Sequence, residues 1–135
     1  MDTISPAAHL EHLRAIAARC AVPIEDVQIV PSIQAWCEDR GLPETNPFRS
    51  GKTVRNNVTG HYLILLAQEI TGSTQNSIIS AMELRGHIDR TGVLRSPDTF
   101  LLHLFLHELA HAQFPEASED ECDEWAFSQL AVNAA

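Results

Sequence analysis

The stretch Phe100–Phe114, FLLHLFLHELAHAQF, is the most informative part of this sequence. It contains an HExxH motif, in which His107 and His111 are four residues apart and Glu108 lies between them. On an α-helix, residues four apart share one face, so the two imidazoles can bind one metal ion. Glu108 is then placed to act as a general base on a metal-bound water.

The flanking residues predict that this stretch is a helix. Ser96 is a suitable N-cap, Pro97 suits the first helical position, and Asp98 places an acid in the first turn. Pro115 ends the helix. The remaining side chains are almost all apolar, which indicates a buried helix. Burying unpartnered polar groups costs a few kcal/mol, and a metal ion would offset that cost.

Two other interpretations of the histidines remain open. The stretch can be a core helix whose histidines are hydrogen-bonded within the protein, since motif matches carry a false-positive risk. His103 extends the row to three histidines. We expect it to pack or to support a ligand, because ligands on three successive turns spread too far along the helix axis to bind one tetrahedral ion.

A catalytic zinc site needs a third protein ligand, which must come from outside this helix. Ser118 and Glu121 form an S-x-x-E capping box, which predicts a second helix from about Glu119 to Val132. The intervening turn centres near Glu116, and His111 and Glu121 are equally far from it along the chain. In an antiparallel helix pair they would face each other, so we predict Glu121 as the third ligand.

Three further roles follow from the same segment. Glu121 can instead only cap its own helix, since one carboxylate does not serve both purposes fully. Glu124, one turn further on, is then the reserve ligand. Asp123 is a candidate to hydrogen-bond a metal-binding histidine.

The segments HELAH (107–111) and ECDEWA (121–126) resemble the HELGH … EAxxFA arrangement of the ImmA/IrrE-type metallopeptidases, a minimal gluzincin family. Ala110 stands where that family usually has Gly, and Cys122 replaces the common Ala. The resemblance implies a zincin-like fold and a protein substrate such as a transcriptional regulator. It also implies that Glu108 is catalytic and that Zn²⁺ is bound by His107, His111 and Glu121.

Size and composition predict one domain over residues 1–135, because 44% of its 135 residues are hydrophobic and 20% are charged. The sequence contains no run of about 18 apolar residues, the length that a membrane span requires. It also shows no recognisable signal peptide. Cys20, Cys37 and Cys122 form no disulfide framework, so we expect a cytoplasmic protein. The net charge of −9 argues against nucleic-acid binding, because acidic surfaces repel phosphates.

The rest of the chain is expected to form an N-terminal helix and a small mixed β-sheet. The ranges are a helix over 5–21, strands over 26–30 and 61–70, and loops over 41–60 and 86–95. Residues 33–40 form either a short helix, which we favour, or a second strand. The sequence Ser50-Gly51-Lys52-Thr53 is not a P-loop, since Asn46 stands where that motif requires Gly. The segment 77–84 is compatible with a strand or a helix, and we place the substrate-binding edge strand there.

Together these features predict an α+β, zincin-like metallopeptidase whose C-terminal helix pair carries the metal site. The alternative is a non-catalytic regulatory or protein-binding module, in which zinc stabilises the helix pair and Glu124 or Cys122 supplies a fourth ligand. A third hypothesis is a helical interaction protein that binds no metal. Candidates for stabilising a reaction oxyanion are Tyr62, His61, His87 and Arg85.

Overall fold

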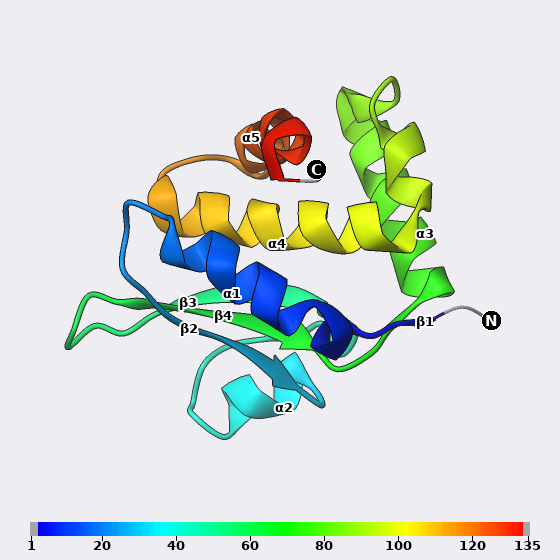
Figure 1. Ribbon diagram of the computed structural model, residues 1–135. Coiled ribbons are helices and arrows are strands. Elements are labelled where there is room, and N and C mark those ends of the chain that lie inside the picture. Colours follow the sequence, from blue (N-terminus) through cyan, green and yellow to red (C-terminus); the bar gives the residue numbers. More distant parts are fainter. Residues whose placement is uncertain (1–2, 134–135) are drawn as a thin grey trace.

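The computed structural model describes residues 3–133, which form a mixed α+β fold (Figure 1). This confirms the predicted fold class at that level. In chain order the elements are β1 (Thr3–Ile4), a 3₁₀ turn (Pro6–His9), α1 (Leu10–Ala18), β2 (Ile24–Val30), α2 (Ile33–Glu38), β3 (Gly51–Arg55), β4 (Tyr62–Ala67), β5 (Ile70–Thr71), α3 (Gly72–Met82), a π-type turn (Glu83–His87), a 3₁₀ turn (Thr91–Arg95), α4 (Pro97–Gln113) and α5 (Glu119–Asn133).

The main sheet has the strand order β2-β4-β3, with β2 parallel and β3 antiparallel to the central strand. Helices cover both faces of β4, so its residues Ile64, Leu65 and Leu66 are fully buried. Such a strand is expected to be a continuous apolar run, as YLILLA is. β3 lies at the edge of this sheet, and the short strands β1 and β5 form a separate antiparallel pair.

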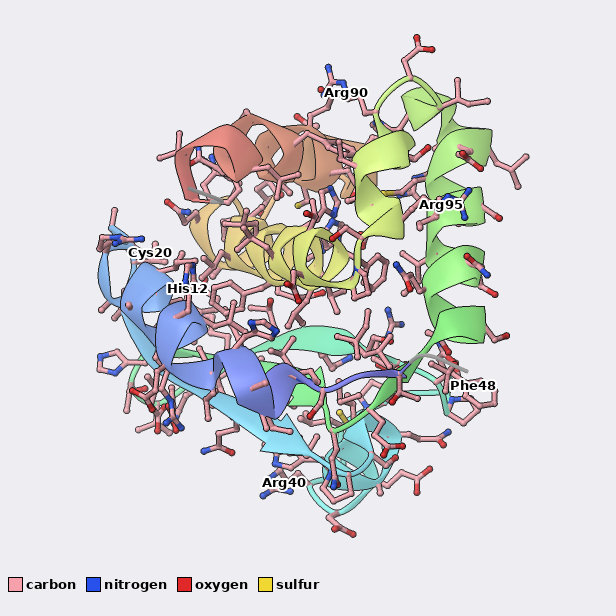
Figure 2. All side chains as sticks on the ribbon, turned by 45° about the vertical axis from the view of Figure 1, so that its right-hand side comes forward. His12, Cys20, Arg40, Phe48, Arg90 and Arg95 are labelled. Atoms are coloured by element: carbon pink, nitrogen blue, oxygen red, sulfur yellow. The ribbon has the colours of Figure 1, made fainter. Side chains whose placement is uncertain are left out.

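The elements are stacked in layers with α4 near the centre (Figure 1). α1 and α4 cover one face of the sheet, α2 covers the other, and α5 packs on the side of α4 that faces away from the sheet. α3 stands at an angle to these layers beside the N-terminal half of α4 (Figure 2). The larger apolar core therefore lies between the sheet, α1, α4 and α5.

The predicted C-terminal helix pair is confirmed almost to the residue. α4 begins at Pro97 and α5 begins at Glu119, as the capping residues indicate. Ser96 occupies the N-cap position of α4, but its hydroxyl makes no capping hydrogen bond. In the part of the chain that is described, no helix combines the length and the apolar character that crossing a bilayer requires.

The predicted edge strand over 77–84 is wrong, because residues 77–82 belong to helix α3 and residues 83–84 to the turn that follows it. The Thr71 hydroxyl caps the helix by accepting a hydrogen bond from the Thr74 amide at 3.1 Å. Gln75, Ile79 and Met82 then fall on one buried face. The polar residues 71–76 thus cap and begin a helix.

The predicted loop over 41–60 is partly wrong, because it contains strand β3. The preceding segment is fixed by Glu44, whose carboxylate is buried and binds Lys52 (2.9 Å) and Arg49 (3.2 Å). Burial alone would raise the pKa of Glu44, but hydrogen bonds from Lys52 and Arg49 lower it to about 2. Gly60, with a φ of 77°, closes the hairpin that returns to β4.

Candidate metal centre

His107 and His111 lie on one face of α4, one turn apart, as the motif predicts. Their Nε2 atoms are 3.1 Å from each other, and their side chains are 13% and 27% exposed. The apolar residues around them bury α4, so the two imidazoles face α5 at the edge of the core. The structure therefore brings together two of the three predicted ligands.

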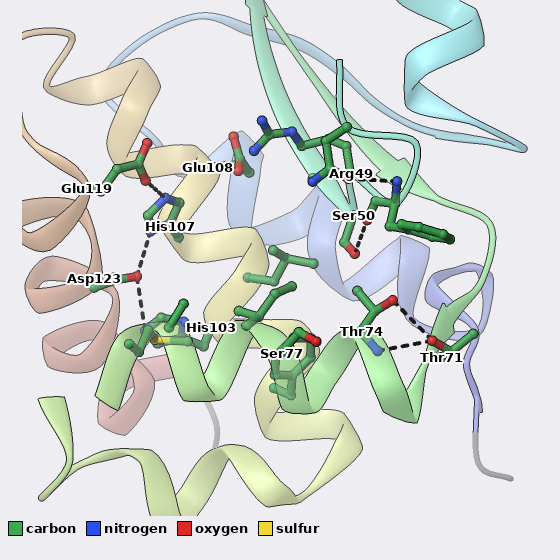
Figure 3. A pocket seen from close by; sticks show the side chains of 18 of the residues that line it. Arg49, Ser50, Thr71, Thr74, Ser77, His103, His107, Glu108, Glu119 and Asp123 are labelled. Atoms are coloured by element: carbon green, nitrogen blue, oxygen red, sulfur yellow. Dashed lines mark hydrogen bonds and ion pairs between the residues drawn. The ribbon is translucent and has the colours of Figure 1, made fainter. Parts of the chain in front are cut away.

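Glu119, the first residue of α5, completes this group (Figure 3). Its carboxylate oxygens lie 2.7 Å from His107 Nε2 and 3.4 Å from His111 Nε2. Zn–N distances of 2.0–2.1 Å in a tetrahedral site separate neighbouring ligand atoms by about 3.3 Å. The three donors are thus spaced for one ion, and a small local adjustment would admit it.

The structure does not bring Glu121, the predicted third ligand, to the histidines. Its carboxylate accepts a hydrogen bond from the Ser118 amide (3.0 Å), and its own amide donates to the Ser118 hydroxyl (3.2 Å). This is the predicted capping box. Residues two apart on a helix point about 200° away from each other, so Glu119 faces α4 when Glu121 faces solvent.

Asp123 lies one turn after Glu119 and accepts a hydrogen bond from His107 Nδ1 at 2.7 Å. This contact leaves Nε2 of His107 free to bind a metal ion. Glu124, the reserve ligand, instead pairs with Arg90 and lies 3.4 Å from His87 Nδ1. The sequence does contain a signal for Glu119 and Asp123, since their spacing of four matches that of the two histidines.

His103 packs behind the site. Its side chain is 3% exposed, its ring lies 4.4 Å from that of Phe127, and its Nε2 is 3.9 Å from Asp123 Oδ1. Burial lowers the pKa of His103 to about 4, so it is neutral at pH 7. Its position fits the expectation that it packs or supports a ligand.

Glu108 points from α4 toward the edge strand β3. The Thr53 hydroxyl lies 2.8 Å from Glu108 Oε1 and 2.7 Å from the Glu108 carbonyl oxygen. A Cβ at Gly51 would come within 3.2 Å of Glu108 Cγ, so a larger residue there would push the Glu108 side chain by a few tenths of an ångström. The sequence-based prediction did not include Gly51 or Thr53 among the residues of the site. The β-branched pair Thr53-Val54 after a glycine was the only signal for them.

A cavity of about 820 Å³ opens beside these groups (Figure 3). α4 forms its floor, with His107 and Glu108 at one end and Phe100 at the other. α3 and the turn after it, which carries Arg85, form one wall, and the segment 46–51 forms the opposite wall, so we call these two segments the cleft walls. The apolar residues of the cleft are Phe48, Ile78, Ala81, Met82, Phe100 and Leu104.

Two carboxylates hold a proton on His107. Burial disfavours the charged form of His107, but hydrogen bonds to Asp123 and Glu119 outweigh burial and raise the pKa of His107 to about 10. Hydrogen bonds from His107 and His111 lower the pKa of Glu119. This donor set, two imidazoles and a carboxylate with a second carboxylate behind, fits Zn²⁺.

The neighbouring group of His87, Asp120 and Asp123 also has the spacing of a metal site. However, the Arg85 guanidinium donates to both aspartates, so a positive charge already lies among them. We therefore do not assign a metal ion to this group.

The remaining sequence candidates, Cys122 and the four possible oxyanion-stabilising residues, do not belong to the group of three donors. Cys122 is buried behind His111, with its Sγ 3.6 Å from Nδ1, the nitrogen that faces away from Glu119. Burial and nearby carboxylates, Glu119 first among them, raise the pKa of Cys122 to about 11, so it is a neutral thiol. Of the oxyanion candidates, Arg85 lines the cleft, whereas Tyr62, His61 and His87 are not among its lining residues.

Comparison with known proteins gives no relative for this chain: no family model, no curated protein and no solved structure matches it. The functional argument therefore rests on the geometry of the site.

Proposed function

We propose that this protein is a zinc-dependent metallopeptidase that cleaves an extended segment of a protein substrate. The proposed ligands are His107, His111 and Glu119, which replaces Glu121 of the sequence-based hypothesis. The observation that carries the proposal is the convergence of these three donors at one end of a cleft, with Glu108 beside them.

Bound zinc would supply Lewis-acid chemistry, lowering the pKa of a water to ~7 and polarising the substrate carbonyl. The residues of the chain perform the other steps. Glu108 takes the proton of the attacking water and passes it to the leaving amine. Thr53 holds the Glu108 carboxylate through the 2.8 Å contact, and Asp123 fixes the ring of His107.

The cleft walls suggest how a substrate binds. β3 is an edge strand beside Glu108, and an extended peptide can add to such an edge by backbone hydrogen bonds. The side chain of a residue near the scissile bond would then enter the apolar part of the cleft, between Ile78 and Leu104. We therefore propose substrates with a large apolar residue next to the cleaved bond.

The resemblance to the ImmA/IrrE-type metallopeptidases suggests an intracellular substrate, such as a transcriptional regulator. This step rests on analogy. The three cysteines are all free, which agrees with a reducing, cytoplasmic location. We propose neither a nucleic-acid partner nor a membrane partner for this acidic chain.

The alternative, a non-catalytic zinc-stabilised module, needs a closed site with a fourth protein ligand. Cys122 and Glu124 were the candidates for that ligand. Among the described residues, the group around His107 contains three donors, while Glu124 binds Arg90 and Cys122 lies behind His111. This arrangement favours an open, catalytic site.

The test is the metal content of protein purified without an affinity tag, measured by plasma mass spectrometry. We expect about one zinc ion per chain in the wild type, and loss of it in Glu119→Ala. Glu121→Ala is the matched control and should retain zinc, since it loses only a helix cap. If Glu119→Ala kept its zinc and Glu121→Ala lost it, Glu121 would be the ligand in place of Glu119. A wild type that stays metal-free after incubation with zinc would refute the metallopeptidase proposal.

A further inference from the structure

Arg85 lies where a cleft wall meets the metal-binding helix pair. It belongs to the turn Glu83–His87 that follows α3, and its side chain reaches across to α5. Its Nε donates to Asp120 Oδ1 at 2.8 Å, and its Nη2 donates to Asp123 Oδ2. The turn is sharpened by Gly86, whose φ of 99° is accessible to glycine without strain.

Asp123 is held at both of its oxygens. Oδ1 accepts from His107 Nδ1 at 2.7 Å, and Oδ2 accepts from Arg85. The side chain is only 3% exposed, so water does not replace either contact freely. The two donors come from different elements, His107 from α4 and Arg85 from the turn after α3. A carboxylate anchored at both oxygens has a fixed plane, and it therefore fixes the ring it binds.

We propose that Arg85 is a positioning residue for the metal centre. It holds Asp123, Asp123 holds His107, and so the orientation of one metal ligand is set by a residue of the cleft wall. This inference rests on the proposed function, since it takes His107 to be a zinc ligand. It predicts that the zinc affinity of α4 and α5 depends on a contact from outside these helices.

Arg90 provides a matched comparison within the same connection. It also joins the segment after α3 to α5, by pairing with Glu124, and its guanidinium lies 5.6 Å from the ring centre of Phe127. It does not contact Asp123 in the described structure. Loss of Arg90 therefore removes an ion pair between the same elements without releasing the carboxylate behind His107.

The experiment measures the zinc dissociation constant by competition with a chromophoric chelator. Variants are Arg85→Gln, Arg90→Gln, Asp123→Asn and the double variant Arg85→Gln/Asp123→Asn. Loss of a partner behind a metal ligand typically weakens affinity 10–100-fold, so we expect about tenfold or more for Arg85→Gln and Asp123→Asn. Arg90→Gln should stay within about threefold. Because Arg85 acts through Asp123, the double variant should bind zinc about as weakly as Asp123→Asn alone.

A second measurement covers the event that Arg85→Gln does not fold. Arg85→Lys keeps the charge, but an ammonium lacks the fork that binds two carboxylates at once. It should weaken zinc binding several-fold and shift the absorption spectrum of the Co²⁺-substituted protein, which reports ligand geometry. Arg90→Lys should change neither property.

Two results would overturn the role of Arg85 while leaving the zinc site intact. One is equal zinc affinity in the Arg85 and Arg90 variants. The other is additive weakening in the double variant, which would mean that Arg85 does not act through Asp123. A wild type that binds no zinc would overturn the proposed function and this inference together.

Discussion

The helix pair α4–α5 and the cleft walls differ in what they contribute to the site. The helix pair carries the proposed metal ligands and Glu108. His107, Glu108 and Asp123 have little exposed surface, whereas Glu119 is 62% exposed. The walls are more open, with Phe48 72% exposed and Ala81 also exposed at the surface. Chemistry and metal binding are therefore expected to depend on the helix pair, and substrate binding on the walls.

Variants can test this division. A change in the helix pair should alter metal binding or kcat, whereas a change in a wall should alter KM and leave zinc in place. Arg85 and Gly51 are the expected exceptions, since Arg85 holds Asp123 of the helix pair and Gly51 packs against Glu108. The predictions below run from the largest expected effect to the smallest.

The largest effect is expected for Glu108→Gln in the helix pair. The amide cannot accept the proton of the attacking water, so kcat/KM should fall by about 10²–10⁴, the usual contribution of a general base. Zinc content should be unchanged, because Glu108 is not among the three proposed ligands. Glu116→Gln, on the exposed turn between the helices, is the control. Full peptidase activity in Glu108→Gln would remove Glu108 from the mechanism.

The second prediction concerns the stability of the metal-free protein. The pKa of His107 is about 10 in the folded protein against about 6.5 when unfolded. The stability from this raised pKa is complete below pH 6.5 and is lost as the pH rises toward 10. We expect the free energy of unfolding to fall by roughly 2–4 kcal/mol between pH 6.5 and pH 9.5.

Urea unfolding with a chelator present measures how the free energy of unfolding changes with pH. His107→Gln should remove most of this pH dependence, whereas His12→Gln, a change at an exposed histidine of α1, should not. The pKa values of Glu119 and Asp123 are lowered, so these groups act at acidic pH. The stability that they contribute is lost as the pH falls below the usual pKa of a carboxyl group. A metal-free protein equally stable at both pH values would contradict the charged network around His107.

The third prediction tests a wall. Ala81→Phe places a ring in the cleft beside Ile78 and should raise KM roughly tenfold for substrates with a large apolar residue, without loss of zinc. Ser80→Phe is the control, since Ser80 is on α3 but does not line this cleft. Steady-state kinetics on a peptide series measure both. If Ala81→Phe lowered kcat alone, the wall would be shaping the chemistry and the division would fail.

The smallest effect is expected for Gly51→Ala on β3. The added Cβ would lie 3.2 Å from Glu108 Cγ, so the Glu108 side chain, the proposed general base, must move by a few tenths of an ångström. We expect a two- to tenfold fall in kcat, in keeping with the sensitivity of catalysis to small misplacements. Gly92→Ala meets no atom within 4 Å and is the control. Unchanged kcat in Gly51→Ala would show that Glu108 tolerates the shift.

Local signals in the sequence determined the helix pair. Pro97, the HExxH spacing and the Ser118–Glu121 capping box act within one or two turns of a helix, so they fix where α4 and α5 begin and which residues share a face. The apolar run Tyr62–Ala67 similarly determined the buried strand β4. These patterns also led to His107, His111 and Glu108 as residues of one site.

Only the tertiary structure decided the third donor and the walls. Whether Glu119 or Glu121 faces the histidines depends on the rotation of α5 against α4, and a chain distance from the turn does not determine that rotation. β3 exists because β4 offers a backbone partner, and α3 is helical because Thr71 caps it and its apolar face meets the core. Such contacts join residues far apart in the chain, so no local pattern contains them.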